Sequence, residues 1–411
     1  MIEKDIEKQL SIILKGAEDV ILVEELKDLI STSIENNQPL KVKLGLDPTA
    51  PDIHLGHTVV LTKLRQFQDL GHEAILIIGD YTARVGDPSG RSSLRPSLSP
   101  EKIEENAKTY MNQAFKILDE SKTKVIRNSE WFENLKFSEV LNITSRFTIA
   151  RMLERDDFKK RFSSNQPITI MEFLYPLMQA YDSVAIKADI ELGGTDQKFN
   201  LLMGRELQKE YGQKPQIAIT MPILVGLDGV KKMSKSLGNY VGVNENPNEI
   251  FGKIMSIPDN IMIDYFTLLT KLTKEEIEKI KDDIENERLN PSIAKRKLAS
   301  LIIENLYDIN SAKNAEDNFN KIFKDKSIPD EINEFILFKK DYPSNKIKII
   351  NLLSESKLCS SNSEARRVIE QSGIKINNKK INDINLELSL DEINSAIIQR
   401  GKRNFIKIII K

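Results

Sequence analysis

Cysteine and histidine are scarce in this chain. Its 411 residues include a single cysteine, Cys359, and three histidines. One thiol cannot form a disulfide within the chain or a cysteine-based zinc site, and it fits a reducing compartment. No apolar run is long enough to span a bilayer, and residues 1–10 lack the apolar core of a signal peptide. We therefore expect a soluble cytoplasmic protein with no metal cage and no membrane partner.

The chain also has almost no net charge, because 60 basic residues balance 61 acidic ones to give −1. Hydrophobic residues make up 40%, which is ample for a core, and the length predicts two or three domains. The charge is uneven, because residues 345–411 carry 13 Lys and Arg against 7 Asp and Glu, a net +6, and leave −7 for the rest. This basic module predicts a polyanionic partner, although a solvated face explains it equally well.

Two of the three histidines share one tetrapeptide, His54-Leu55-Gly56-His57. It follows a strand-like run at 42–46 and opens an amphipathic helix at 58–70, so the imidazoles stand at a helix N-terminus. Such an end attracts phosphate through free N–H groups and the helix dipole. A second motif, Lys232-Met233-Ser234-Lys235-Ser236, offers two cations. Each motif alone has about even odds of being a cap or a solvated loop, but together they predict one ATP site.

A third polar segment follows an apolar strand at 74–78. It reads Gly86-Asp87-Pro88-Ser89-Gly90-Arg91, with Arg95 four residues beyond. A tight turn would explain the Asp-Pro-Ser-Gly run by itself. We favour a phosphate-facing loop, because ligand sites of open α/β sheets gather where strands end.

Strand and helix patterns alternate as far as residue 223, which predicts an α/β fold with a Rossmann-like parallel sheet. Helical patterns follow, and then a linker and a small α+β segment. The expected strands are 41–46, 74–78, 124–127, 185–190 and 217–219, with 374–377 and 405–410 near the C-terminus. The expected helices include 18–31, 58–70, 101–118, 168–183, 248–255, 260–270, 274–285, 291–307, 312–323, 347–353 and 362–371. The expected domains are 1–240, 241–326 and 345–411, joined by a linker at 327–344.

Four segments resemble the bacterial tyrosyl-tRNA synthetases, which are class I enzymes. They are Gly45 to His57, Tyr175 to Asp182, Gly193 to Gln197, and the Lys232 to Ser236 motif. The resemblance extends over essentially the whole chain, and residues 345–411 are similar to a small RNA-binding fold shared with a ribosomal small-subunit protein. It implies that 1–240 is a catalytic domain for tyrosine and ATP. It also implies that 241–326 recognises the anticodon region and that 345–411 binds RNA.

The implied reaction joins the tyrosine carboxylate to the α-phosphate of ATP and then transfers the tyrosyl group to the 3′-terminal adenosine of tRNA(Tyr). The carboxylate is already anionic at neutral pH, so activation needs alignment and charge stabilisation but no catalytic base. Magnesium is expected with ATP, held mainly by its phosphates. The resemblance assigns the catalytic contacts to Thr49, His54, His57, Arg91, Arg95, Lys232 and Lys235. It assigns ATP binding to Asp47, Gly56, Gly194, Asp196 and Lys235.

Tyrosine selection is expected on the helix at 168–183, where Tyr175, Gln179 and Asp182 fall on one face at i, i+4 and i+7. An ordinary polar stripe would show the same spacing. By resemblance, Asp182 accepts from the substrate phenol, while Tyr175, Gln179, Gln197 and Asp87 surround its α-ammonium group. The chain departs from many relatives at Lys43, where they carry a tyrosine that donates to the phenol. Lys43 either supplies that donor or points away and another group replaces it.

The resemblance further implies L-tyrosine, ATP and tRNA(Tyr) as partners and a homodimer, with residues 130–151 as a plausible contact region. Adjacent Arg366 and Arg367 are the candidate tRNA contacts. The rival hypotheses are a tryptophanyl-tRNA synthetase, a small nucleotidyltransferase and a non-catalytic RNA-binding paralogue. The set at 175, 179 and 182 disfavours the first, the long helical extension weakens the second, and the intact histidine and lysine motifs argue against the third.

Overall fold

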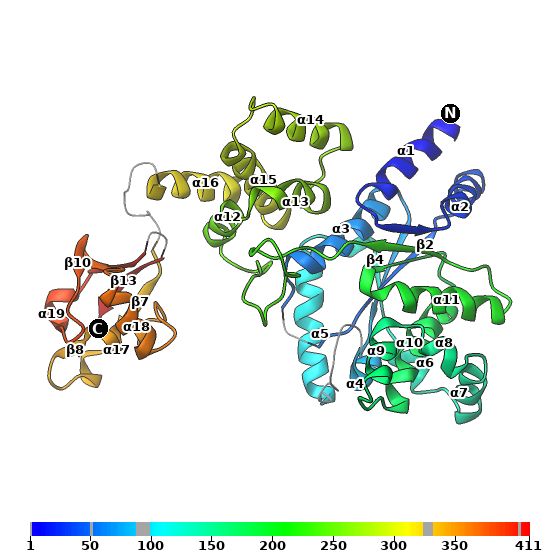
Figure 1. Ribbon diagram of the computed structural model, residues 1–411, viewed down its shortest axis with the longest axis horizontal. Coiled ribbons are helices and arrows are strands. Elements are labelled where there is room, and N and C mark those ends of the chain that lie inside the picture. The colour runs from blue at the N-terminus through cyan, green and yellow to red at the C-terminus, as the bar shows by residue number, and fades with distance from the viewer. Residues whose placement is uncertain (1, 50–51, 88–98, 324–331, 402–403) are drawn as a thin grey trace. The chain divides into compact units, whose positions relative to one another are not determined.

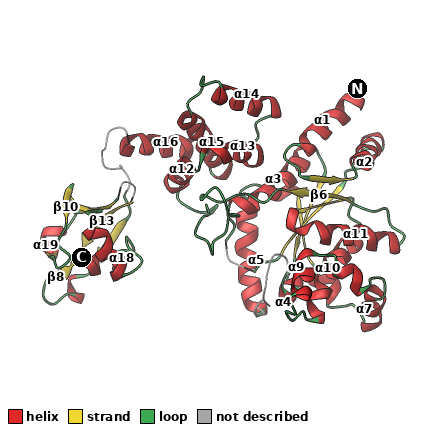
Figure 2. Cartoon of the chain, in the orientation of Figure 1, coloured by secondary structure: helices red, strands yellow, loops and turns green. Residues whose placement is uncertain are grey.

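A six-stranded sheet organises the N-terminal part of the chain (Figures 1 and 2). The structure is a computed structural model that describes residues 2–49, 52–87, 99–323, 332–401 and 404–411. The strand order is β1-β6-β5-β2-β3-β4, and every neighbouring pair is parallel except β1 with β6. The strands are β1 (Asp19–Ile21), β2 (Lys41–Leu46), β3 (Glu73–Ile78), β4 (Thr123–Arg127), β5 (Ile190–Gly194) and β6 (Ile217–Met221). This parallel sheet confirms the expected fold class.

Helices connect and cover these strands. The helix α3 packs against β2, β3 and β5, whereas α11 packs against β5 and β6 and also against α10. The described helices here are α1 (Ile2–Leu14), α2 (Val23–Glu35), α3 (Leu55–Asp69), α4 (Thr82–Val85), α5 (Pro100–Ala114), α6 (Ser129–Phe132), α7 (Phe137–Thr144), α8 (Ile149–Met152), α9 (Asp156–Ser163), α10 (Ile170–Ile186) and α11 (Lys198–Glu210), with short 3-10 turns η1 (Glu120–Lys122) and η2 (Thr195–Gln197). None of the helices that the structure describes is both long and apolar enough to cross a membrane.

The central strands β3, β5 and β6 form where the sequence is apolar and the chain is largely buried. The residues from Ala74 to Ile78 in β3 are at most 1% exposed, as a central parallel strand requires. In β2, Val42 and Leu44 are buried in the same way, and so is Lys43, which lies between them. A buried charge inside a strand needs a partner, because an unpaired ammonium in the core is costly.

The segment after the sheet is helical, as expected. The helix α14 has the predicted bounds, and the others begin or end within three residues of theirs. The elements are α12 (Pro247–Met255), η3 (Asp259–Ile261), α13 (Met262–Leu269), α14 (Lys274–Glu285), α15 (Pro291–Leu306) and α16 (Ile309–Phe323). Asn246 and Asn290 cap α12 and α15, and a proline follows each as the first helical residue.

The chain consists of two compact units, residues 1–312 and 313–411. The second unit has its own core around Ile349, Leu353, Ile369 and Ile398, all buried. Its sheet has the order β10-β9-β12-β13-β7, and a separate pair joins β11 to β8. Its elements after α16 are β7 (Glu334–Leu337), η4 (Lys339–Asp341), β8 (Lys346–Lys348), α17 (Ile349–Glu355), α18 (Asn362–Glu370), β9 (Ile374–Ile376), β10 (Lys379–Ile381), β11 (Glu387–Ser389), α19 (Leu390–Ile393), β12 (Ile397–Arg400) and β13 (Asn404–Ile410).

Three local expectations differ from the structure. The strand expected at 185–190 begins only at Ile190, because α10 continues to Ile186 and ends at Lys187 in the left-handed conformation. The helix expected at 18–31 begins at Val23, because residues 19–21 form an edge strand on β6. The segment expected as a linker contains β7, which pairs in parallel with β13.

Candidate functional site

The site lies where the strand order of the first sheet reverses. The strands β2 and β5 are neighbours, but the strand that follows β2 (β3) and the strand that follows β5 (β6) lie on opposite sides of this pair. Ligands of open α/β sheets bind outside the carboxyl ends of such a pair. Asp47 and Thr49 follow β2, and Gly194 and Asp196 lie at the end of β5. The expected nucleotide residues therefore come to one edge of the sheet.

The histidine motif and the lysine motif converge through backbone hydrogen bonds. The N–H of Leu55 donates to the carbonyl of Val241 at 2.9 Å, and the N–H of Val243 donates to the carbonyl of Ile53 at 3.1 Å. These bonds join the start of α3 to the segment directly after the Lys232–Ser236 motif. Two sequence motifs that lie far apart in the chain thus face one space.

Charged side chains extend this contact. The ammonium of Lys235 lies 2.9 Å from a carboxylate oxygen of Asp52, two residues before the histidine motif. Lys232 lies close enough to Asp196 to oppose the rise in its pKa, which burial causes in the first place. Lys235 therefore lies near the segment that follows β2, and Lys232 lies near the segment that follows β5.

The two imidazoles close the first turn of α3. His54 is the N-cap residue and its Nδ1 accepts from the N–H of Gly56 at 3.1 Å, while Nδ1 of His57 accepts from the N–H of His54 at 3.2 Å. Burial, then the neighbouring charges of His57 and Lys235, lower the pKa of His54 to about 3. Burial and then Lys235 lower the pKa of His57 to about 4. Both rings are neutral at pH 7, and each keeps its other nitrogen for donation.

The lysine motif sits in a loop held by its own polar contacts. The side chain of Asn239 accepts from the N–H of Ser234 at 2.9 Å and donates to Asp228 at 2.8 Å. Met233 is buried and its N–H donates to the carbonyl of Leu224. These contacts fix the backbone of the motif between its two lysines.

A second set of contacts surrounds Asp182 on α10. This carboxylate is 4% exposed and accepts from the indole N–H of Trp131 at 3.0 Å and from the amide of Asn128 at 3.5 Å. Burial raises its pKa to about 7, although Lys43 and these donors oppose the rise. The hydroxyl of Tyr175 donates to Asp47 at 2.8 Å, which ties α10 to the end of β2.

A chain of amides and charges lies beside it. Gln197 donates to Asp87 at 2.8 Å, and Asn200 donates to the side-chain oxygens of Gln179 and Gln197 at 2.9 and 3.0 Å. The buried guanidinium of Arg155 donates to Asn200 at 3.2 Å and lies 3.4 Å from Asp87. Three of the four expected α-ammonium residues, Gln179, Gln197 and Asp87, are therefore joined in one network through Arg155 and Asn200.

Comparison with known proteins identifies the family. The model of the tRNA synthetases class I (W and Y) matches residues 35–324, and the model of the tyrosine–tRNA ligase SYY-like C-terminal domain matches residues 336–408. A tyrosine–tRNA ligase of Carboxydothermus hydrogenoformans is 54% identical over 407 residues, which is 99% of both chains. The chain belongs to the tyrosine–tRNA ligase family. It is an aminoacyl-tRNA synthetase of class I, and the tryptophan alternative is set aside by these full-length relatives and by the C-terminal domain.

Further comparisons agree with this family. The tyrosine–tRNA ligase of Geobacter sulfurreducens is 51% identical over 400 residues, covering 97% of this chain and 98% of the relative. Among solved structures, the tyrosyl-tRNA synthetase of Archaeoglobus fulgidus complexed with L-tyrosine matches with a TM-score of 0.59 and 26% identity. That match covers 75% of this chain and 99% of the other. A C-terminally truncated mitochondrial tyrosyl-tRNA synthetase of Aspergillus nidulans, at 21% identity and a TM-score of 0.64, shares the fold.

The structure places the remaining expected residues as follows. Arg91 and Arg95 lie outside the described residues. Arg366 and Arg367 are exposed on α18 in the second unit. Asp47 accepts from Thr82 as well as Tyr175, so its carboxylate links α4, α10 and β2. Lys43 lies beneath α10 and contacts protein groups, which are described below.

Sequence reasoning missed several polar residues of the site. Asn128 and Trp131 follow β4, Arg155 precedes α9, Asn200 is on α11, and Glu191 is on β5. None belongs to a short motif that signals its role. Glu191 alone carried a usable signal, because it is an acid within an otherwise apolar strand next to the strand of Lys43.

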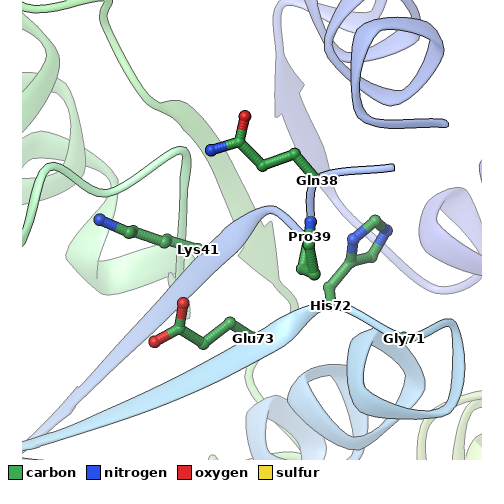
Figure 3. A pocket seen from close by; sticks show the side chains of 6 residues that line it. All are labelled: Gln38, Pro39, Lys41, Gly71, His72 and Glu73. Carbon is green, nitrogen blue, oxygen red and sulfur yellow. The ribbon is translucent and has the colours of Figure 1, made fainter. Parts of the chain in front are cut away.

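Two hollows have different relations to this site. A groove of about 850 Å³ adjoins it, since Asp196 and Arg155 line it together with α8 and α9. A smaller hollow of about 420 Å³ lies at the opposite edge of the sheet, where β2 and β3 begin (Figure 3). Both ring nitrogens of its His72 have partners, the N–H of Leu40 and the side chain of Gln9. The imidazole of that hollow is therefore already hydrogen-bonded within the protein.

Proposed function

We propose that this enzyme activates L-tyrosine with ATP, releases pyrophosphate, and transfers the tyrosyl group to the 3′-terminal adenosine of tRNA(Tyr). The main support for the proposal is the backbone pairing of residues 53–55 with residues 241–243, which brings the histidine motif close to the loop of the lysine motif. The polar network on α10 beside them supports an amino-acid site at the same edge. We also propose a cytoplasmic location, because the substrates of this reaction are found there.

The phosphate roles follow from position and charge. His54 and His57 offer neutral N–H donors at the start of α3, and Gly56 leaves space between them. A Cβ at Gly56 would lie 2.9 Å from the ring of His54. Lys232 and Lys235 supply positive charge for the leaving pyrophosphate, with Thr49, Arg91 and Arg95 as further contacts. Such preorganised charge acts where charge develops in the transition state. Magnesium enters with the ATP substrate on its phosphate oxygens.

The nucleotide's sugar would lie against the end of β5. Gly194 and Asp196 form this wall, and a Cβ at Gly194 would approach the Asp196 carboxylate to 2.7 Å. The position therefore suits glycine. Asp196 accepts from ribose hydroxyls in this arrangement, and Asp47 supports the same edge through α10.

The amino acid would lie along α10. Asp182 accepts from the phenol, and Gln179, Tyr175, Gln197 and Asp87 hold the α-ammonium group. A phenylalanine would leave the buried Asp182 without this donor, and an unpaired buried polar group costs about 1–3 kcal/mol or more. Selection of tyrosine then rests on one carboxylate and the donors that orient it.

The tRNA would contact several parts of the chain. We assign tyrosine activation to residues 1–240, anticodon-region contacts to 241–326 and a phosphate grip to 345–411, with Arg366 and Arg367 exposed for it. The groove beside Asp196 gives the 3′ end of the tRNA a route to the adenylate. Phosphate contacts make such binding salt-dependent.

We further propose a homodimer through the segment at 130–151. Large apolar side chains are exposed within it: Phe137 is 75%, Leu141 53% and Ile149 68% exposed. Apolar patches of this kind mark interaction surfaces in soluble proteins. Light scattering of Phe137→Glu with Ile149→Glu should report a monomer, whereas an unchanged mass would remove this surface from consideration.

The function is tested by ATP–pyrophosphate exchange with each of the twenty amino acids. Exchange with tyrosine alone is the expected result. Exchange with tryptophan instead, or none at all, would overturn the proposal. The tRNA step is tested with Arg366→Gln/Arg367→Gln, which should weaken aminoacylation much more than exchange. This variant is preferable to deleting 345–411, because such a deletion removes the strand that pairs with β7.

A further inference from the structure

Beneath the amino-acid site lies a fully buried ion pair. Lys43 and Glu191 are register partners on the neighbouring strands β2 and β5, and their charged groups are 3.0 Å apart. Both side chains are 0% exposed. Neither residue belongs to the phosphate motifs, and the site described above does not use the pair.

The ammonium of Lys43 has no donor left for a substrate. A lysine ammonium has three N–H groups. Here they meet Glu191, the hydroxyl of Ser183 at 2.7 Å and the carbonyl of Gln179 at 2.9 Å. Lys43 therefore does not take the place of a phenol donor. It holds the turn of α10 that carries the selecting residues.

The carboxylate of Glu191 is equally occupied. It accepts from the side-chain amide of Gln179 at 3.0 Å, from the hydroxyl of Ser183 at 3.1 Å and from the amide of Gln216. Gly204 on α11 leaves room for this cluster, because a Cβ there would lie 2.5 Å from the Gln216 amide and 3.2 Å from Glu191. The pair is thus surrounded by hydrogen-bonding partners and closely packed against Gly204.

A buried ion pair is a weak means of stabilising a fold, because removing two charges from water offsets most of their attraction. A better account of this pair lies in what it touches. Gln179 is hydrogen-bonded to both members: its carbonyl accepts from Lys43, and its side-chain amide donates to Glu191. Asp182, three residues further along α10, feels both charges, since Lys43 lowers its pKa and Glu191 raises it.

We propose that Lys43 and Glu191 are positioning residues for tyrosine selection: the pair fixes Gln179 and Ser183 on α10 and balances the charge around Asp182. The substrate they serve is the phenol-bearing amino acid, so this inference rests on the function proposed above. Glu191 orients the Gln179 amide toward the α-ammonium site, and Lys43 keeps Asp182 an anionic acceptor for the phenol.

The charged and titratable groups around Asp182 are few enough to separate by mutation. Lys43 acts on it from β2, Glu191 from β5, and Tyr175, bonded to Asp47, from its own helix. The groups that reach it from the segment after β4 are the neutral donors Trp131 and Asn128. Changing one member of the pair therefore alters the charge near Asp182 in a known direction.

The test measures the tyrosine KM in pyrophosphate exchange from pH 5.5 to 9.5 for the wild type, Lys43→Met, Glu191→Gln and the double variant. Lys43→Met leaves a second anion beside Asp182, so the pH midpoint of the tyrosine KM should rise by about one unit or more. Glu191→Gln leaves an unbalanced cation and should lower that midpoint. The double variant should return it toward the wild-type value. The KM for ATP should stay within about threefold in all of them, because the pair acts on the amino-acid site.

The matched control is Lys63→Met. Lys63 is 1% exposed and donates to three backbone carbonyls, of Ile12, Ile13 and Lys15. The substitution therefore removes a buried amine from α3 that is comparable to that of Lys43. Its tyrosine midpoint should equal that of the wild type. If Lys43→Met does not fold, Glu191→Gln and the double variant still decide the matter.

Opposite shifts for Lys43→Met and Glu191→Gln support the inference, because a purely structural role would weaken both variants without moving the midpoint. Unmoved midpoints in an active enzyme overturn the inference and leave the proposed function standing. A wild type that shows no tyrosine-dependent exchange overturns both.

Discussion

Asp182 should make the folded protein less stable at high pH, and Asp182→Asn isolates that effect. The carboxylate is buried and burial raises its pKa from 3.8 to about 7. The folded state therefore binds a proton more tightly than the unfolded state between those values. The free energy of unfolding of the protein therefore falls as the pH rises from about 4 to 7, and it stays at the lower value above pH 7.

The size of the effect follows from the shift and the contacts. A shift of about three units corresponds to an upper limit of about 4 kcal/mol. The amide loses the stronger hydrogen bond that a charged acceptor makes with Trp131, which is worth about 1.5–3 kcal/mol. A net gain of about 1–2 kcal/mol should remain for Asp182→Asn at pH 8, which raises the melting temperature by a few degrees.

The assay compares melting temperatures of wild type and Asp182→Asn at pH 8 and pH 5, alongside tyrosine-dependent exchange at pH 8. The variant should be more stable than wild type at pH 8, should lose that advantage toward pH 5, and should bind tyrosine poorly. A stability difference that is the same at both pH values would refute the reasoning. So would a variant that is less stable than wild type at pH 8.

Three further predictions concern other titratable groups. Lys235→Ala should lower kcat for exchange on the order of 100-fold or more, whereas its exposed neighbour Lys231→Ala should change it little; equal losses would argue against a specific phosphate contact. At saturating tyrosine, kcat/KM for ATP should show no ionisation near pH 6.5, because the pKa of His54 is about 3, and an inflection there that His54→Asn abolishes would contradict its neutral state. Burial and the charge of Lys15 lower the pKa of Lys63 to about 7, so the folded state loses this proton at a lower pH than the unfolded state does. The free energy of unfolding of the wild type, measured in urea, should therefore rise from pH 7 to 9 relative to that of Lys63→Met, by up to about 2 kcal/mol. The same pH dependence in both proteins would contradict this prediction.

The parts of the fold that the sequence predicted well are those with a local cause. The apolar run of β3 and the alternation of strand and helix predicted the parallel sheet. The helical patterns after it predicted α12, α14 and α15, and each of these begins at a capping residue in the structure. The start of β5 was misplaced because the apolar residues from Val184 to Ile186 end a helix here. Nothing in those three side chains separates a helix end from a strand; the left-handed Lys187 does, and that is a property of the backbone.

The site shows the same division. The histidine motif and the lysine motif are each an unbroken run of residues, so their residue types and their order in the chain indicated phosphate chemistry. The donors to Asp182 come from a segment about fifty residues away, and Arg155 reaches Asp87 across a similar separation. Such partners depend on which strands lie side by side, and a single sequence does not contain that information. Glu191 was within reach of reasoning, since a buried lysine in a strand demands an anion nearby.

The loop that carries the lysine motif is fastened at both ends. It is paired at Val225 with Lys232 on one side and at Val241 with Leu55 on the other. A segment tethered this way has already given up most of its chain entropy, since the entropy of closing a loop depends on how far apart its ends can wander. If this loop holds a triphosphate, as the proposed function requires, binding has little chain left to order. The attraction between the lysine ammonium groups and the phosphates would then stabilise the charge of the reacting groups and would not be offset by the cost of ordering the loop.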